Sequence, residues 1–456
     1  MNFTTINPAT GRRIRVYRTH SPAQVGNALR RAEAAYQGWR DEPLANRARY
    51  LRKVASLLRK RTDEFASLIT QEMGKPLGQA RAEIEKTAAM CHYYAKNGGR
   101  FLADERPAGA AKNVLVVFEP IGIVLAIMPW NFPFWQVFRA AVPALMAGNA
   151  VLLKHSENVT GCALAIEEVF FAAAKPGQRG LFQTLVISTA RIPALIADPR
   201  IQGVTLTGST GAGKHVASLA GAAMKKGVFE LGGSDPYLIL ADADLDHAAE
   251  VCAQARLGNT GQSCISAKRF IVVASVRRAF EAKFATRLAA RRIGDPRDPN
   301  TDIGPMARRD LRAALHAQVE ASLRAGARLV FGGHPLPGPG FFYASTLLAG
   351  VKKGMPAYSE ELFGPVAAVI AVRDEREAVA VANDSIYGLG AAVFSRNRSR
   401  ARRVAARLQA GTVFINAQVR SDQAVPFGGI KQSGHGRELG LFGIREFVNV
   451  KTVRVA

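Results

Sequence analysis

The chain has 456 residues, of which 48% are hydrophobic and 21% charged, so wholesale disorder is excluded and two or three domains are expected. Four cysteines without a C-x-x-C pair exclude a disulfide framework and a structural zinc site; they favour a reducing, cytoplasmic compartment, and we expect no metal. The net charge of +25 comes from dispersed arginines rather than a basic tract, which disfavours nucleic acid as a partner but would attract anionic cofactors and substrates.

The first residues, MNFTTINPATGRR, lack the apolar region and cleavage site of a signal peptide. The uncharged stretch between Glu119 and Arg139 is interrupted by Pro120, Pro129 and Pro133. A lipid-exposed helix tolerates such interruptions poorly, so we expect no membrane span here. The stretch instead suggests a buried strand followed by a loop that carries chemistry.

The predicted elements begin with helices and continue as alternating strands and helices. Residues 21–39 have a Ser N-cap and helical apolar spacing, and residues 45–74 repeat that pattern up to Gly74. Strands are expected where short apolar runs occur: residues 114–118, 121–128, 150–154, 184–188, 203–207, 236–241, 269–274 and 447–456. This order predicts an α/β protein with parallel sheets.

A glycine-rich turn follows the predicted strand 203–207 and opens a helix. Such turns let backbone N–H groups approach a phosphate, and the helix dipole favours the anion. Gly208, Gly213 and Lys214 have P-loop spacing, but His215 stands where a Ser or Thr would bind Mg²⁺. A nucleotide triphosphatase is therefore a weak alternative, and a simple packing turn stays open.

Cys264 is the candidate nucleophile because its neighbours, GNTGQSCISAKRF, are polar rather than apolar. A polar pocket is expected to lower its pKa and favour the reactive thiolate. The other cysteines, Cys91, Cys162 and Cys252, are predicted to be core residues. No cysteine adjoins Cys264, which argues against a local redox disulfide.

Two further polar residues lie in apolar surroundings. Glu230 closes an apolar strand before two glycines, where desolvation would raise its pKa and suit it to general-base work. Asn131 lies between prolines and aromatic residues in PWNFPFW, where its amide could donate to an oxyanion. The simpler alternatives are a carboxylate that caps a turn and an amide that satisfies loop backbone.

Together these segments resemble the aldehyde dehydrogenase superfamily. NPATG, PWNFP, the strand–GST–helix unit, ELGG, GQ-x-C, EELFGPV (360–366) and PFGGIKQSGHGRELG (426–440) occur in the family order over nearly the whole chain. The resemblance implies a Rossmann-type NAD(P)-binding domain (1–104 and 121–232), an α/β catalytic domain (233–425) and a small β oligomerisation arm (105–120 and 440–456). It also implies self-association as a dimer or a tetramer.

The resemblance implies that an aldehyde is oxidised to an acid through a cysteine thioester. Cys264 would be the nucleophile, Glu230 the general base, and Asn131 an oxyanion donor together with the Cys264 backbone amide. The residues implied to contact the cofactor are Trp130, Lys154, Glu157, Gly208, Ser209, Glu361 and Phe363.

Glu157, three residues after Lys154, would repel a 2′-phosphate, so we expect NAD, with NADP possible. QEMGKP, IMPWNFPFWQV, LKH, ELGGSDP and GDPRD are similar to short bacterial succinate-semialdehyde dehydrogenases. In that group the positions of Trp135, Arg139 and Ser421 line the substrate pocket, and Arg139 could hold a distal carboxylate. Alternatively, Arg139 starts a helix and pairs only with a local acid.

Several alternatives stay open at this point. Glutarate semialdehyde is one methylene longer than succinate semialdehyde, and pockets discriminate a methylene weakly. The others are a catalytically inactive scaffold, a basic nucleic-acid-binding protein, and an acylating dehydrogenase that passes the thioester to coenzyme A. The last usually lacks the glutamate that stands here as Glu230.

Overall fold

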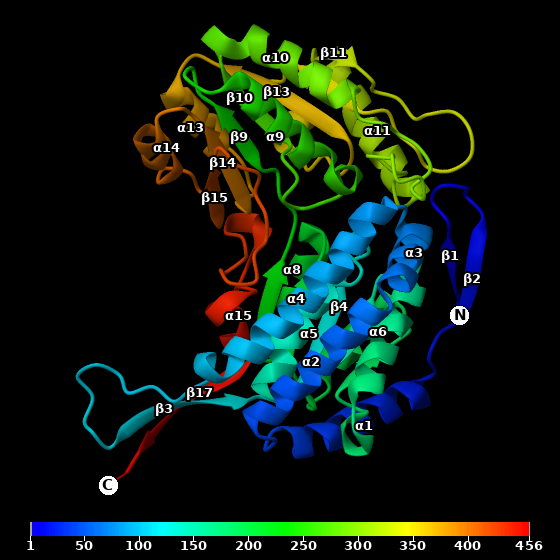
Figure 1. The fold of residues 1–456 in the computed structure, drawn as a ribbon, viewed down its shortest axis with the longest axis vertical. Helices are drawn as coiled ribbons and strands as arrows, with labels where there is room; N and C mark the ends of the chain where they lie inside the picture. The colour runs from blue at the N-terminus through cyan, green and yellow to red at the C-terminus, as the bar shows by residue number, and fades with distance from the viewer. Residues whose placement is uncertain (1, 456) are drawn as a thin grey trace.

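The computed structural model describes residues 2–455, and it is an α/β fold built on two large, mainly parallel sheets. In Figure 1 the seven-stranded sheet and its helices form the upper part, while the six-stranded sheet and the N-terminal helices form the lower part. A two-stranded ribbon that carries the C-terminus projects at the lower left. The predicted α/β architecture is confirmed.

The N-terminal segment forms the hairpin β1 (Asn2–Ile6) and β2 (Arg13–Arg18), followed by helices. The helices of the lower part are α1 (Pro22–Trp39), α2 (Leu44–Lys60), α3 (Thr62–Met73), α4 (Leu77–Phe101), α5 (Trp135–Ala147) and α6 (Thr160–Ala173). Ser21 caps α1 through a reciprocal capping box with Gln24, as its sequence predicts. The single helix expected over 45–74 is interrupted at Arg61 and ends at Gly74, which has φ of 80°.

The six-stranded sheet has the order β16-β8-β7-β4-β5-β6. Its strands are β4 (Ile123–Met128), β5 (Ala150–His155), β6 (Phe182–Thr184), β7 (Ile201–Thr207), β8 (Lys226–Glu230) and β16 (Gly434–His435). All neighbours are parallel except β16, which runs antiparallel to β8. The connections include η1 (Glu157–Val159), η2 (Pro176–Gln178), η3 (Thr189–Arg191), α7 (Ile192–Ala197) and α8 (Thr210–Ala222).

The strand expected over 184–188 is wrong beyond Thr184, where β6 ends. The Ile187 N–H donates to the Leu185 carbonyl oxygen at 3.0 Å, so the backbone turns back on itself instead of extending. Leu185 and Ile187 are nevertheless buried. Their apolar character therefore reflects burial in the core rather than a continuing strand.

The seven-stranded sheet has the order β11-β12-β13-β10-β9-β14-β15. Its strands are β9 (Pro236–Ile239), β10 (Arg269–Val273), β11 (Arg328–Phe331), β12 (Thr346–Ala349), β13 (Val366–Val372), β14 (Gly390–Phe394) and β15 (Thr412–Ile415). The helices between them are α9 (Leu245–Leu257), η4 (Gly258–Gly261), α10 (Ala274–Ala289), α11 (Arg309–Arg324), α12 (Pro356–Ser359), α13 (Glu375–Asn383) and α14 (Arg398–Ala405).

The remaining elements close the chain. They are η5 (Lys431–Ser433), α15 (Gly440–Arg445), β3 (Val114–Pro120) and β17 (Val448–Arg454). β3 and β17 pair antiparallel from Val448 opposite Pro120 to Arg454 opposite Val114. Between residues 2 and 455, no helix is long and apolar enough to cross a membrane, and no cluster of His, Cys, Asp or Glu could hold a metal ion.

The described chain has four sheets, the two large ones and the two-stranded β1–β2 and β3–β17 pairs. The prediction assigned no domain to residues 426–439, whereas β16 at Gly434–His435 joins the edge of the six-stranded sheet. The domain boundaries themselves stay a prediction.

Candidate active site

The loop that carries Cys264 is held in an unusual backbone conformation. It follows η4, in which Asn259 and Thr260 have φ of 55° and 58°, and Gly261 has φ of 70°. A Cβ at Gly261 would lie 2.3 Å from the Gly364 carbonyl oxygen, so only glycine fits there. Such conformations are costly and persist where the surroundings fix them, as at functional sites.

Hydrogen bonds from neighbouring segments fix this loop. The Asn259 N–H donates to Gln79 Oε1 of α4 at 2.8 Å. The Asn259 side-chain amide donates to the Asn131 and Gln262 carbonyl oxygens at 2.9 and 3.1 Å. The loop is therefore attached both to a helix and to the segment that follows β4.

Lys268 anchors the loop from the inside. Its ammonium, 1% exposed, donates to the carbonyl oxygens of Ser263, Cys264 and Ser266 at 2.9–3.1 Å. It also forms an ion pair with Glu361 at 3.4 Å. One side chain thus connects the Cys264 loop to a residue implied to bind the cofactor, a role that sequence reasoning did not assign.

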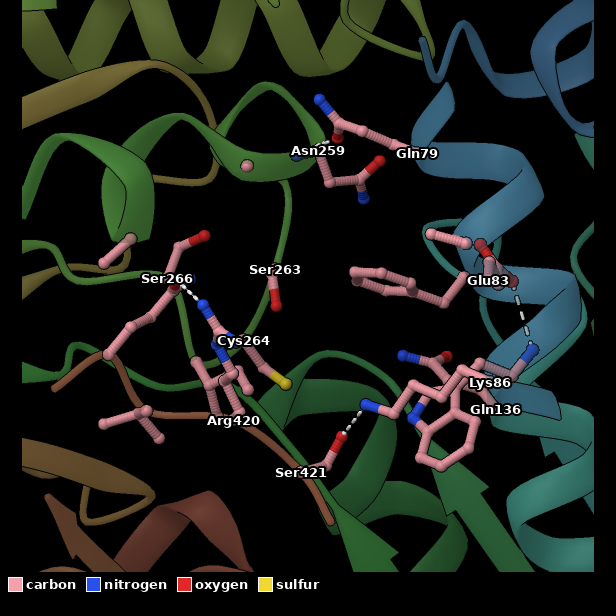
Figure 2. Close-up of a pocket in the computed structure, with 18 of the residues that line it drawn as sticks. Gln79, Glu83, Lys86, Gln136, Asn259, Ser263, Cys264, Ser266, Arg420 and Ser421 are labelled. Carbon is pink, nitrogen blue, oxygen red and sulfur yellow. Dashed lines mark hydrogen bonds between the residues drawn. The ribbon is translucent and has the colours of Figure 1, made fainter. Parts of the chain in front are cut away.

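Cys264 lies at a cavity of about 480 Å³ between α4, α5 and the loops near residues 264 and 420 (Figure 2). Side chains from these segments line it: Lys75, Gln79, Glu83, Lys86, Phe132, Trp135, Gln136, Arg139, Asn259, Ser263, Cys264, Ile265, Ser266, Gln418, Val419, Arg420, Ser421 and Phe427. Most of this set is apolar or amide-bearing, and it includes lysine and arginine side chains. The cavity can therefore accept a small organic molecule that carries a negative charge.

The predicted lowering of the Cys264 pKa is wrong. Burial raises the pKa of this thiol to about 12, although Arg139 and Lys268 act in the opposite direction. The Lys268 ammonium donates to the carbonyl oxygens of Ser263 and Cys264. Deprotonation of Cys264 therefore needs a base or a change in its surroundings.

Asn131 is buried at the base of this loop. Its side-chain Nδ2 donates to the Gln262 carbonyl oxygen at 3.0 Å. Among residues 2–455 no acceptor is found for the Cys264 backbone N–H. The two donors implied by the family resemblance thus come from segments that the hydrogen bonds of Asn259 hold together.

Glu230 ends β8 and is 2% exposed. Burial raises its pKa well above the usual value, and the neighbouring Glu438 raises it further, so the predicted direction is correct. Within the described chain neither carboxylate oxygen has a hydrogen-bond partner. Glu230 is not among the residues that line the cavity, and a Cβ at Gly428 would lie 2.8 Å from its Oε1.

Arg139 pairs with an acid of the protein. Its guanidinium is 3% exposed, forms a buried ion pair with Glu438, and lies 4.7 Å from the Phe427 ring centroid. Burial raises the pKa of Glu438, and Arg139 opposes that rise. The alternative raised from the sequence expected a local acid at a helix start, whereas Arg139 lies inside α5 and its partner, Glu438, is far along the chain.

The residues implied to hold the cofactor gather at the carboxyl ends of neighbouring parallel strands. Lys154 lies opposite Ile127 near the end of β5, and Thr207 opposite Glu230 precedes Gly208. Ligands bind at this edge in open α/β sheets. Ser209 caps α8 by accepting from the Ala212 N–H at 3.3 Å, so α8 begins directly after the end of β7.

Three other residues are implied to contact the cofactor, namely Glu361, Trp130 and Phe363. A Cβ at Gly232 would lie 2.6 Å from Glu361 Oε2, and the Gly233 N–H donates to Glu361 Oε1 at 3.1 Å. The Trp130 and Phe363 rings pack edge to face with centroids 5.8 Å apart. A helix N-terminus for phosphate, a buried lysine and a carboxylate for ribose hydroxyls fit the chemistry of a dinucleotide.

Lys154 is buried and its pKa is lowered by that burial, while Glu157 acts against the shift. Glu157 begins η1 and is exposed to solvent. The contacts of Lys154 and Glu157 with an adenosine ribose stay a prediction.

The chain belongs to the aldehyde dehydrogenase family, whose pattern matches residues 1–453. Over the full length of both chains it is 49% identical to a probable succinate-semialdehyde dehydrogenase [NADP(+)] of Synechocystis sp.. It is 47% identical to the succinate semialdehyde dehydrogenase [NAD(P)+] Sad of Escherichia coli, covering 98% of this chain and 97% of that one. The resemblance and the fold predicted from the motifs are thus confirmed.

Solved structures agree with this membership. A succinic semialdehyde dehydrogenase from Streptococcus pyogenes, solved with NADP⁺, is 37% identical and superposes with a TM-score of 0.96 over 99% of each chain. A structure described for cofactor and substrate selection by Gox0499 is 42% identical, with a TM-score of 0.98 over the whole of both chains. The chain is accordingly an NAD(P)-dependent aldehyde dehydrogenase.

Proposed function

We propose that this enzyme oxidises succinate semialdehyde to succinate through a thioester on Cys264. The observation that carries the proposal is the cavity: a thiol lies among Trp135, Lys86 and Ser421, with basic groups but a small volume of about 480 Å³. A four-carbon aldehyde with one distal carboxylate suits that size and charge. The similarity to succinate-semialdehyde dehydrogenases of Synechocystis sp. and Escherichia coli supports the same substrate.

The residues supply each step in turn. The Cys264 thiol gives its proton to a solvent water and its sulfur attacks the aldehyde carbon, while Asn131 Nδ2 and the Cys264 N–H stabilise the oxyanion. Bound NAD(P) supplies the acceptor for the hydride that leaves this carbon. Collapse of the oxyanion gives the thioester, and a water then attacks it.

Glu230 accepts the proton of that water, and the Cys264 sulfur leaves with a proton as the acid is released. The raised pKa of Glu230 makes it a stronger base than an exposed carboxylate once it is ionised. Because its oxygens lack hydrogen-bond partners in the described chain, its carboxylate is free to turn towards the thioester. Glu230→Gln should leave acylation intact and slow turnover, which a pre-steady-state burst would reveal.

The test of the substrate compares succinate semialdehyde with glutarate semialdehyde, acetaldehyde and an aminoaldehyde, by following reduced cofactor. We expect the highest kcat/KM for succinate semialdehyde, and no turnover by Cys264→Ala. A higher value for glutarate semialdehyde would transfer the proposal to the longer substrate. Turnover only of uncharged or cationic aldehydes would contradict the proposal that the substrate carries a distal carboxylate.

For the cofactor we propose a preference for NAD over NADP. The support is Glu157, an exposed carboxylate three residues after the buried Lys154, which would repel a 2′-phosphate. The relatives are named for NADP(+) or NAD(P)+. A kinetic comparison of NAD with NADP therefore tests whether this chain differs from them. Glu157→Ser should raise kcat/KM with NADP relative to NAD by roughly tenfold or more, and an unchanged ratio would overturn the proposal.

A further inference from the structure

The cavity beside Cys264 has several cationic side chains, and most of them are already neutralised or exposed. Lys75 forms a buried ion pair with Glu83, and Arg139 does the same with Glu438. Arg420 is exposed and its guanidinium donates to Gln418 Oε1 at 3.4 Å. This leaves the ammonium of Lys86 to consider.

Lys86 differs from Lys75 and Arg139 in having no ion-pair partner, and from Arg420 in being partly buried. Its Nζ donates to Ser421 Oγ at 2.7 Å and lies 4.1 Å from the Trp135 ring centroid. Within residues 2–455 it takes part in none of the ion pairs. The cation is instead held between a hydroxyl and an aromatic face, which are neutral groups.

The position of the Lys86 ammonium indicates a binding site for an anionic ligand. Figure 2 shows the Lys86 amine reaching from α4 into the cavity towards Ser421, while the Cys264 sulfur enters the same cavity from the opposite loop. Burial is the main cause that lowers the pKa of Lys86 to about 8, and Arg139 adds to it, while Glu83 and Asp422 oppose it. A partly buried cation without a counter-ion gains more from an incoming carboxylate than an exposed one does.

We propose that Lys86, together with Ser421, binds the distal carboxylate of the aldehyde, and that Arg139 instead neutralises Glu438. The proposal rests on the proposed function, because it names the group that recognises the substrate's charge. Ser421 accepts its hydrogen bond from Lys86, so its own hydroxyl hydrogen is free to donate to the carboxylate. The Trp135 ring covers the same site, which gives the subsite one cation, one hydroxyl and one apolar wall.

The role of Arg139 follows from its buried pair. Removing Arg139 would leave Glu438 uncompensated beside Glu230, which Glu438 already affects electrostatically. Breaking such a pair destabilises a protein strongly. Arg139→Met is therefore expected to lower the thermal midpoint, whereas Lys86→Met removes no ion pair and should keep it.

The experiment measures a selectivity ratio: kcat/KM for succinate semialdehyde divided by kcat/KM for butyraldehyde, which has the same carbon chain without the carboxylate. Lys86→Met should lower this ratio roughly 10- to 100-fold, through KM for the acid, and Lys86→Arg should restore much of it. Lys96→Met makes the same substitution at an exposed position of α4 and serves as the matched control.

Each result has a defined meaning. Equal losses for both aldehydes would make Lys86 a structural residue and overturn the proposal, as would an unchanged ratio. A collapse of the ratio in Arg139→Met at an unchanged thermal midpoint would assign the carboxylate to Arg139 instead. If the parent enzyme rejects succinate semialdehyde, the proposed function fails by itself, and the same ratio is measured with glutarate semialdehyde against pentanal.

Discussion

Cys264 shows how burial decides the state of a single side chain. With a pKa raised to about 12, its thiol is protonated at neutral pH in the free enzyme. Because the fraction of thiolate grows tenfold with each pH unit below that pKa, alkylation by iodoacetamide should accelerate roughly tenfold per unit between pH 7 and 9. Labelling rates followed by mass spectrometry check this.

The other cysteines provide an internal control for that measurement. Cys91, Cys162 and Cys252 are fully buried and should stay unlabelled while the protein is folded. A rate that levels off near pH 7 would contradict the prediction, because it would indicate a thiolate stabilised in the free enzyme.

The candidate site could be predicted only in part at the level of residues. Cys264, Glu230 and Asn131 follow from their local sequence and from the family motifs. The pKa of Cys264 could not be predicted, because segments far along the chain cause its burial. Lys86 and Ser421 are 335 positions apart, and Lys86 in ARAEIEK has the pattern of an ordinary solvated helix face.

The catalytic loop before β10 depends on one buried cation. Lys268→Met would release the Ser263, Cys264 and Ser266 carbonyl groups and leave Glu361 without its ion pair. Small displacements of a nucleophile are costly in rate, so kcat should fall roughly 10- to 100-fold, and binding of NAD should weaken. Steady-state kinetics and a fluorescence titration with NAD measure the two effects separately.

The control for this prediction is Lys283→Met, since Lys283 forms an exposed ion pair with Asp246 away from the site. A lower thermal midpoint with unchanged kcat and unchanged NAD affinity would mean that Lys268 only stabilises the fold. A fall in kcat with unchanged NAD affinity would mean that Lys268 positions the Cys264 loop but that its ion pair with Glu361 does not contribute to NAD binding.

Elements were predicted well where a local signal determines them. The capping box at Ser21 and the apolar strands β5, β7 and β10 are clear in the sequence. The break at Arg61 was missed because both flanking helices share one apolar pattern. Asp63 and Glu64 lie in the first turn of α3, where acidic residues favour a helix start, and they were the available signal.

At the scale of the whole molecule, the ribbon of β3 and β17 stands apart from both large sheets (Figure 1). A two-stranded ribbon is marginally stable by itself and leaves its edges unpaired. Val450 on β17 is 57% exposed, although an apolar residue at such an edge gains by being covered. Self-association through this arm, which stays a prediction, would supply that cover.

Val450→Glu should therefore shift the protein from an oligomer towards the monomer, because a charge would be buried without a partner at the interface. Light scattering coupled to size-exclusion chromatography measures the mass, and the parent chain should give a multiple of the single-chain value. Phe171→Glu, at a position 47% exposed on α6, places the same charge elsewhere and should leave the mass unchanged. A parent protein that is monomeric at micromolar concentration would contradict the prediction, and an oligomer unaffected by Val450→Glu would assign the interface to another surface.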